Sequence, residues 1–438
     1  MEEQAVLTIA GIATLSIACQ WFAWWVKLPA ILFLLLAGIL IGPIAGLIHP
    51  DALFGPLLFP FVSLSVAVIL FEGSLTLKFS EISGLQSVVR RMVTSGLLVT
   101  WTVITLSTYY LLDFPFELAL LFGALAVVTG PTVIVPMLRT VRPNPRISSI
   151  LRWEAIVIDP IGALLAVLVF EFIVSGQDGE ALGRTLISFA KILFVGVGIG
   201  ATAGYLLGLA LRNHWLPEYL QNVTVLAAVF AVFAVSNEIE SEAGLLTVTV
   251  MGLWLANMRK VPIEGVIDFK ESLSVVLIST LFIVLAARID FDQFRSLGWG
   301  ALGVLAAIQF IARPLKIMVA TYGSSLTWQE RSLLAWIAPR GIVAAAVAAL
   351  FSLRLQNAGY EQAELLVPLI FMVIIGTVVL QSATAGSLAR LLKVAEPEPR
   401  GFLIIGANPV ARNIAVALKK QGYDSLLCDN SWSNVRAA

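Results

Sequence analysis

Apolar residues fill this chain in long stretches that polar residues interrupt only briefly. A helix needs about 20 apolar residues to cross the hydrocarbon core of a bilayer. Stretches of this kind predict thirteen transmembrane helices, at residues 5–26, 28–49, 56–77, 89–111, 116–138, 149–174, 185–211, 219–237, 243–257, 266–287, 298–320, 332–350 and 364–389. The pattern indicates an all-α polytopic membrane protein.

Positive charges are distributed unevenly between the two sets of connections. If the N-terminus lies outside, sixteen Lys and Arg residues fall on the inner side, Lys316 among them, and four on the outer side. Because cytoplasmic loops carry an excess of Lys and Arg, the count predicts a multi-pass inner-membrane protein. Its N-terminus would lie outside and its C-terminus in the cytoplasm.

Composition excludes several other classes of protein. Hydrophobic residues make up 59% of the chain, charged residues 13%, and the net charge is zero, so no nucleic-acid-binding surface is indicated. The two cysteines, Cys19 and Cys428, are too few for a metal cluster or a disulfide framework. The membrane part contains no Walker loop and no Ser/His/Asp set, so an enzyme is not expected.

The composition changes after the predicted membrane domain, residues 1–393. A Pro- and Glu-containing linker, 394–400, leads into residues 401–438, which predict a strand, a helix and a second strand. Asn408 suits the N-cap of that helix and Pro409 its first position. The tail is therefore expected to be a partial α/β, Rossmann-like unit, the start of a larger cytoplasmic domain.

The sixth span, in the stretch WEAIVIDPIGALLAV, contains two carboxylates, Glu154 and Asp159. Ionisable residues in a membrane span are functional by default. Burial favours the protonated form of a carboxylic acid and a nearby cation favours the ionised form, so Asp159 is expected to hold a monovalent cation and a proton in turn. The alternative is a polar residue that only packs helices.

Glu154 lies five positions before Asp159, about 140° around a helix, so the two do not share a face. Arg313, inside the eleventh span, is the expected partner of Glu154. Such a pair would be a structural lock rather than a carrier. Glu72, towards the inner end of the third span, either lines an ion funnel or reaches the interface.

Two spans contain helix-breaking sequences in mid-membrane: Thr129-Gly130-Pro131 in the fifth and Pro339-Arg340-Gly341 in the twelfth. Broken helices persist in a membrane where their freed backbone groups line a cavity or are covered by protein. Two such spans, seven apart, predict inverted repeats of spans 1–6 and 8–13. Arg340 would neutralise carbonyl ends at its break. Simple kinking is the alternative.

In order along the chain, TGPTVIVPMLR, EAIVIDP, SEAGLLTVTVMGLWLAN, ARPLK and PRGIVAAAVA resemble the motifs of NhaP/NHE-type monovalent cation:proton antiporters. The resemblance implies two inverted six-helix repeats whose unwound helices cross near Asp159. It also implies a homodimer, an elevator motion of the domain that carries Asp159, a Glu154–Arg313 pair and cation ligands from Thr129 and Gly130.

Two positions depart from the family pattern. Many relatives have Asn where this chain has Ile158, and many have Asp after the threonine where it has Gly130. A single titrating carboxylate at the site predicts electroneutral exchange of one proton per cation. With fewer ligands, the choice between Na⁺ and K⁺ stays open.

The tail resembles the start of a TrkA-N (RCK) nucleotide-binding domain. A dinucleotide fingerprint needs G-x-G-x-x-G, and this chain has Gly406, Asn408 and Ala411 at the three glycine positions. Asp429 lies at the distance expected of a ribose ligand. The intact domain is therefore a candidate site for an adenine nucleotide or NAD, whereas no cofactor is expected in the membrane domain.

Two other functions remain open. RCK-type domains also gate channels, so a nucleotide-gated cation channel is one alternative, although no filter-like TVGYG stretch is present. A sensor that has lost transport is the second alternative, because Ile158 and Gly130 depart from the pattern. Proton-coupled flux separates both from an antiporter.

Overall fold

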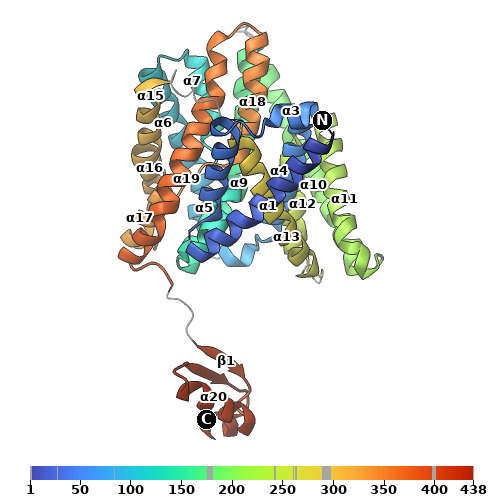
Figure 1. Cartoon of the computed structure of the whole chain (residues 1–438), viewed down its shortest axis with the longest axis vertical. Coiled ribbons are helices and arrows are strands. Elements are labelled where there is room, and N and C mark those ends of the chain that lie inside the picture. Colours follow the sequence, from blue (N-terminus) through green and yellow to red (C-terminus); the bar gives the residue numbers. More distant parts are fainter. Residues whose placement is uncertain are drawn as a thin grey trace. The chain divides into compact units, whose positions relative to one another are not determined.

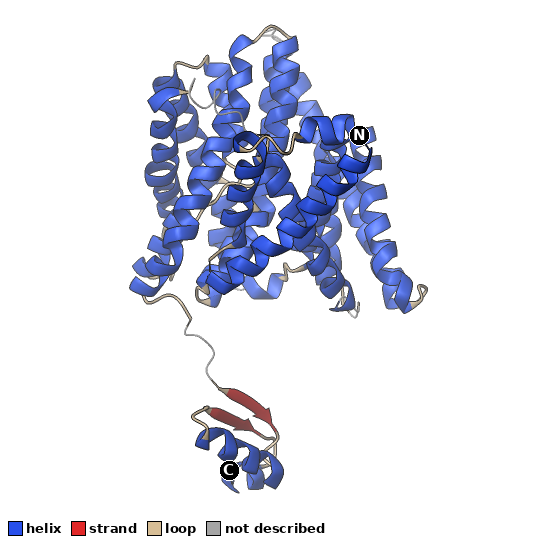
Figure 2. Cartoon of the chain, viewed as in Figure 1, coloured by secondary structure: helices blue, strands red, loops and turns tan. Residues whose placement is uncertain are grey.

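The computed structural model describes residues 2–26, 28–82, 84–174, 181–240, 243–259, 261, 264–288, 297–396 and 401–437. The chain divides into two compact units, Met1–Ala395 and Glu396–Ala438. Among the described residues the first unit is built of helices, and the strands of the sheet belong to the second (Figure 2).

The helices of the first unit pack side by side as a bundle around a continuous apolar core (Figure 1). The first half contains α1 Glu2–Val26, α2 Ala30–Ile39 with the π-helix Leu40–Ile44, α3 Pro50–Phe54, the 3₁₀ turn Gly55–Leu57, α4 Leu58–Leu75, the 3₁₀ turn Phe79–Ile82, α5 Gln86–Val93, α6 Ser95–Leu112, α7 Phe116–Ala126, α8 Pro131–Val141 and α9 Pro145–Val174.

The second half follows the long helix α10 Ala181–Arg212. It contains α11 Glu218–Ile239, α12 Ala243–Asn257, α13 Glu264–Ala286, α15 Gly298–Ala307, the π-helix Ile308–Ala312, α16 Arg313–Ala320, α17 Trp328–Trp336, α18 Ile342–Asn357, the 3₁₀ turn Glu361–Leu365 and α19 Leu366–Leu391.

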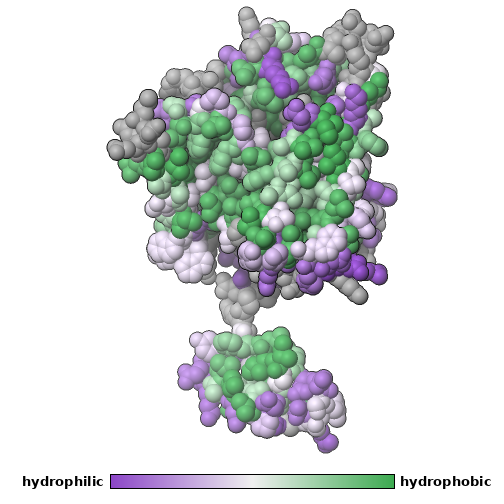
Figure 3. Space-filling model, turned by 90° about the vertical axis from the view of Figure 1, so that its right-hand side faces the viewer, coloured by the Kyte–Doolittle hydropathy of each residue, from purple (hydrophilic) through white to green (hydrophobic). Residues whose placement is uncertain are grey.

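Each predicted span coincides with one helix or with consecutive helical segments, which confirms the all-α membrane fold. Eight helices of the described part are long and apolar enough to cross a membrane, and shorter apolar helices account for other predicted spans. Hydrophobic side chains cover the flank of the bundle, and hydrophilic ones gather towards its ends (Figure 3). This distribution suits a body whose sides face lipid.

The fifth and twelfth predicted spans are each divided in two. The α7 helix ends at Ala126 and α8 begins at Pro131, and a similar break separates α17 from α18. Pro131 lacks a backbone N–H, which is no loss at the first position of a helix. By contrast, Pro160 lies inside the continuous helix α9, where its ring leaves one carbonyl without its usual donor.

The second unit contains β1 Phe402–Ile405, α20 Pro409–Lys420, β2 Ser425–Cys428 and α21 Trp432–Ala437. The two strands pair in parallel, Phe402 opposite Ser425 and Ile405 opposite Cys428. Asn408 is the N-cap of α20, because its side chain accepts a hydrogen bond from the Ala411 N–H. The described tail is one β-α-β unit with a following helix, and it is smaller than a complete Rossmann fold.

Candidate functional site: the crossing of two broken helices

The two breaks meet in the interior of the first unit, backbone against backbone. Thr129 and Arg340 form an antiparallel bridge, and the Gly130 N–H donates to the Pro339 carbonyl at 3.2 Å. A Cβ placed on Gly130 would lie 2.2 Å from the Gly341 Cα atom. Because no side chain fits at this contact, glycine is required on both sides of the crossing.

Asp159 lies on the part of α9 that packs against the first break. Its neighbour Ile158 shares a small buried cluster with Val127, and a Cβ on Gly162 would lie 2.2 Å from a methyl carbon of Val128. The Asp159 side chain is fully buried, with 0% of its surface exposed. The carboxylate is therefore closed off from water in this conformation.

The second break is well supplied with hydrogen bonds from neighbouring helices. Glutamine and threonine side chains, which none of the sequence motifs had singled out, satisfy the freed backbone groups. The bonds are Gln309 Nε2 to the Trp336 carbonyl (3.0 Å), the Ala338 N–H to Gln381 Oε1 (2.9 Å), the Arg340 N–H to Thr377 Oγ1 (3.3 Å) and Gln381 Nε2 to Gln309 Oε1 (2.7 Å). A network of side-chain hydrogen bonds therefore holds this break in one conformation.

Arg340 reaches from the second break to the first. Its Nη1 donates to the Val127 carbonyl at 2.7 Å, at the C-terminal end of α7. A helix C-terminus bears partial negative charge and free carbonyls, so the guanidinium satisfies a group that the break exposes. The prediction placed Arg340 at carbonyl ends of its own break, whereas this bond runs to a carbonyl of the other break.

The first break differs because several of its oxygen atoms are buried without a hydrogen-bond partner among the described residues. These atoms are Thr129 Oγ1, Thr132 Oγ1 and both carboxylate oxygens of Asp159. Buried polar groups are normally paired. Carboxylate and hydroxyl oxygens are hard ligands that suit alkali cations and protons, so this group of oxygens is the candidate ion site.

Glu154 and Arg313 come together in the structure as a buried, bidentate pair. Arg313 Nη2 donates to Glu154 Oε2 at 2.9 Å, Nη1 donates to Oε1, and Nε donates to the Leu334 carbonyl at 2.8 Å. The carboxylate of Glu154 thereby links α9 to α16 and, through Arg313, to α17. These bonds give Glu154 a structural role, because they hold together the helices around the candidate ion site.

Lys316 also belongs to this buried cluster of charges. Its Nζ lies 2.5 Å from Glu154 Oε1, and only 1% of the residue is exposed. The assignment of Lys316 to the cytoplasmic cations was therefore wrong, because the helix continues past Arg313 and turns Lys316 inward. The sequence did contain a signal for this position. Lys316 follows Arg313 by three residues, a spacing that places both cations on one face of a helix.

The comparison with known proteins agrees with this architecture. A family model described as the sodium/hydrogen exchanger, transmembrane, matches residues 10–391. The chain belongs to the sodium/hydrogen exchanger family. This is a family of transporters and not of enzymes.

Curated relatives of this exchanger family are distant in sequence. The K(+)/H(+) antiporter NhaP2 of Shewanella sp. (strain ANA-3) is 24% identical over 373 residues, which cover 84% of this chain and 64% of the relative. The Na(+)/H(+) antiporter 1 of Methanocaldococcus jannaschii is 25% identical over 389 residues, covering 83% and 90%. The chain thus spans somewhat less than two thirds of the first relative's length.

A solved exchanger structure has the same fold. The sodium proton antiporter MjNhaP1 from Methanocaldococcus jannaschii at pH 8 superimposes with a TM-score of 0.73 at 24% identity, covering 90% of this chain and 99% of that one. The likeness covers nearly all of that structure and most of this chain. It establishes the fold, while the ion and the direction of transport are separate questions.

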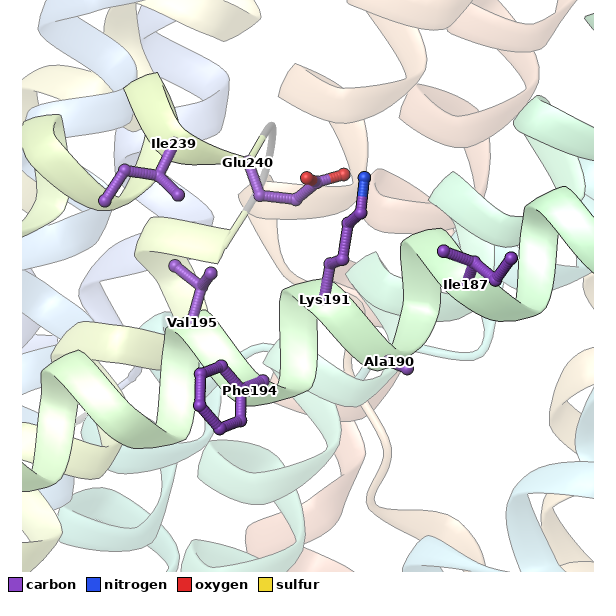
Figure 4. A pocket seen from close by; sticks show the side chains of 7 residues that line it. All are labelled: Ile187, Ala190, Lys191, Phe194, Val195, Ile239 and Glu240. Atoms are coloured by element: carbon purple, nitrogen blue, oxygen red, sulfur yellow. The ribbon is translucent and has the colours of Figure 1, made fainter.

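Two other charged residues, Glu72 and Lys191, lie elsewhere in the exchanger fold. Glu72 is half-buried on α4, next to Gly73, which packs against Ile156 of α9. Its helix therefore borders the helix of Asp159. Lys191 is exposed on α10, where it lines a shallow groove and points towards Glu240 (Figure 4). Neither residue hydrogen-bonds to Asp159.

In the tail, the residues predicted to bind a nucleotide form one hydrogen-bonded loop. Gly406 has a positive φ of 102°, and Asn408 caps α20. The Asp429 carboxylate accepts from the Ala407 N–H at 2.7 Å, from the Ser431 N–H at 2.8 Å and from the Asn434 side chain at 2.9 Å. These bonds, first that of Ala407, lower the pKa of Asp429. The carboxylate that was expected to bind a ribose hydroxyl therefore already accepts hydrogen bonds from the loops after β1 and β2.

Proposed function

We propose that this chain exchanges a monovalent cation, Na⁺ or K⁺, for H⁺ across a membrane, and that Asp159 binds the two in turn. The observation that carries the proposal is the buried Asp159 carboxylate beside the crossing of two broken helices, whose oxygens have no hydrogen-bond partner among the described residues. The names of the relatives, which are K(+)/H(+) and Na(+)/H(+) antiporters, support the same exchange.

The exchange is proposed to be electroneutral, one proton per cation. Of the two carboxylates buried in α9, Glu154 is held by Arg313 and Lys316, which leaves Asp159 as the group that gains and loses charge. A cation and a proton therefore replace each other at one carboxylate. The identity of the cation is part of the test below.

Alternating access is proposed to follow an elevator motion, in a homodimer whose N-terminus lies outside and whose C-terminus is cytoplasmic. The motivation is the complete burial of Asp159, because an occluded ion can leave only if the protein moves. The bridge between the two breaks and the Glu154–Arg313 pair tie α7, α8, α9, α16, α17 and α18 together. Helices tied in this way are suited to move as one body.

Regulation by the C-terminal domain, with an adenine nucleotide or NAD as ligand, is proposed on the contacts of the linker. The Asn144 N–H donates to the Val394 carbonyl at 2.9 Å, and Pro143 bridges Ala395. The Asn144 side chain also accepts from the Ile147 N–H at the start of α9. The start of the linker is therefore joined to the helix that carries Asp159.

The test is ion exchange by purified protein in liposomes that hold a preset pH gradient. On addition of Na⁺, K⁺ or Li⁺, wild type is expected to collapse the gradient with at least one cation, and Asp159→Asn is expected not to. Lys191→Gln, in the exposed groove, is the matched control and should behave as wild type.

Other outcomes of this test separate the alternatives. Equal collapse in wild type and Asp159→Asn would exclude Asp159 as the carrier. Cation flux that leaves the pH gradient intact would indicate a channel. A wild type that moves neither ion would indicate a sensor that has lost transport.

A further inference from the structure

The crossing leaves position 130 without a side chain at the point where the two breaks touch. Any Cβ at Gly130 would collide with the backbone of Gly341, at 2.2 Å from its Cα atom. Position 130 can therefore offer only backbone atoms to an ion beside Asp159, and a side-chain ligand from this break comes from the residues that flank Gly130. Thr132 is the nearest such side chain, because its Oγ1 lies 3.3 Å from the position that a Gly130 Cβ would take.

Thr132 is buried, with 2% of its surface exposed, and its hydroxyl has no hydrogen-bond partner among the described residues. Most buried threonines within the helices of this chain behave differently. Thr100, Thr108, Thr247 and Thr249 each donate to the carbonyl four residues earlier, at 2.8–2.9 Å. This bond is the usual way in which a helical threonine satisfies its hydroxyl.

The helix break explains why Thr132 does not make that bond. The carbonyl four residues before it belongs to Val128, which lies in the unwound stretch between α7 and α8, and the contact recorded for that carbonyl is with Arg340. The hydroxyl of Thr132 is therefore left with its oxygen lone pairs and its proton unused inside the protein. Thr129, three residues earlier in the unwound stretch, also has no hydroxyl partner among the described residues.

The electrostatics of the helix end define what Thr132 can bind. Thr132 is the second residue of α8, whose N-cap, Gly130, has no side chain to cap it. A helix N-terminus bears partial positive charge, so a cation is stable there only beside a negative group. Asp159 is a buried carboxylate on the helix that packs against this break, so it can supply that negative group.

We propose that Thr132 is a ligand of the transported cation and that its hydroxyl oxygen supplies the contact that position 130 does not provide. The inference rests on the proposed exchange function. It also predicts that Thr132 contributes to the selectivity between Na⁺ and K⁺. The number and spacing of the oxygen ligands determine how well the site replaces the hydration shell of each cation.

The test compares Thr132→Val, which removes the hydroxyl at nearly constant volume, with Thr132→Ser, which keeps it. Thr105→Val is the matched control, since Thr105 is also a buried threonine whose hydroxyl has no partner in the described part of the chain, but it lies on α6. In liposomes with a pH gradient, Thr132→Val is expected to raise the cation KM about tenfold while the maximal rate changes little, since hydrogen bonds and ligand contacts to charged groups have this strength. Thr132→Ser and Thr105→Val should retain the wild-type KM.

Selectivity is the second readout. The ratio of the KM values for Na⁺ and K⁺ is expected to change in Thr132→Val and to return towards wild type in Thr132→Ser. A Thr132→Val variant with wild-type KM values for both cations would overturn the inference and leave the exchange function intact. A wild type without any exchange would instead overturn the proposed function.

Discussion

At the scale of single residues, the interior of this protein contains an unequal set of charges. Arg313, Lys316 and Arg340 are buried cations, whereas Glu154 and Asp159 are the carboxylates buried beside them in α9. Arg313 and Lys316 share Glu154, and Arg340 binds the carbonyl of α7. Buried charges are tolerated when they are paired and hydrogen-bonded, and here Asp159 is the one left available for an exchanging ion.

This arrangement predicts an order of stabilities for substitutions in the cluster. Glu154→Gln leaves two cations without a counter-charge and is expected to lower the free energy of unfolding by about 3–5 kcal/mol. Lys316→Met should cost less, because the bidentate Glu154–Arg313 pair remains and one excess charge is removed. Thermal unfolding of the two variants in the same detergent checks this order. Lys316→Met as the less stable of the two would contradict it.

The sequence pointed to part of this cluster and missed the rest, for physical reasons. Asp159, Glu154 and Arg313 were recognisable because a charge within an apolar span has few explanations. Lys316 was not, since it lies near the end of a span, where a lysine usually reaches water. Thr132 carries no sequence signal at all, because a threonine in a helix ordinarily satisfies its own hydroxyl.

At the scale of elements, the broken helices depend on a backbone contact rather than on side-chain packing. The sequence placed both breaks from their Gly and Pro residues. It did not supply the contact between Gly130 and Gly341, which belongs to tertiary structure and came only as an implication of the family resemblance. The glutamines that satisfy the second break were also missed, since Gln309 and Gln381 stand alone in apolar helices.

Gly130→Ala is expected to separate the breaks and to abolish exchange. An added methyl group would meet the Gly341 backbone, which cannot move aside as a flexible side chain can. The expected loss of unfolding free energy is about 3 kcal/mol, the upper end for overpacking. Gly198→Ala is the control, because Gly198 is exposed on α10 with open space around its Cβ position. Thermal unfolding and flux assays give the comparison, and a Gly130→Ala variant as active and stable as Gly198→Ala would refute this view of the crossing.

At the scale of the whole molecule, the first unit ends where the linker meets the helices of the ion site. Asn144 binds the Val394 carbonyl through its N–H and Glu330 Oε1 through its side-chain amide, at 2.9 Å each. Glu330 in turn closes the capping box of α17 with Thr327. Burial alone would raise the pKa of Glu330, but the hydrogen bonds from Thr327 and Asn144 lower it below its ordinary value, which favours the ionised carboxylate that accepts these bonds.

The central claim is that a cation and a proton replace each other at Asp159. It is tested most directly by proton release when cation is added to purified protein in a weakly buffered solution, without any membrane gradient. Wild type is expected to release one proton for each Na⁺ or K⁺ bound, and Asp159→Asn is expected to release none. Equal release from wild type and Asp159→Asn would contradict the account, because the proton would then leave from another group.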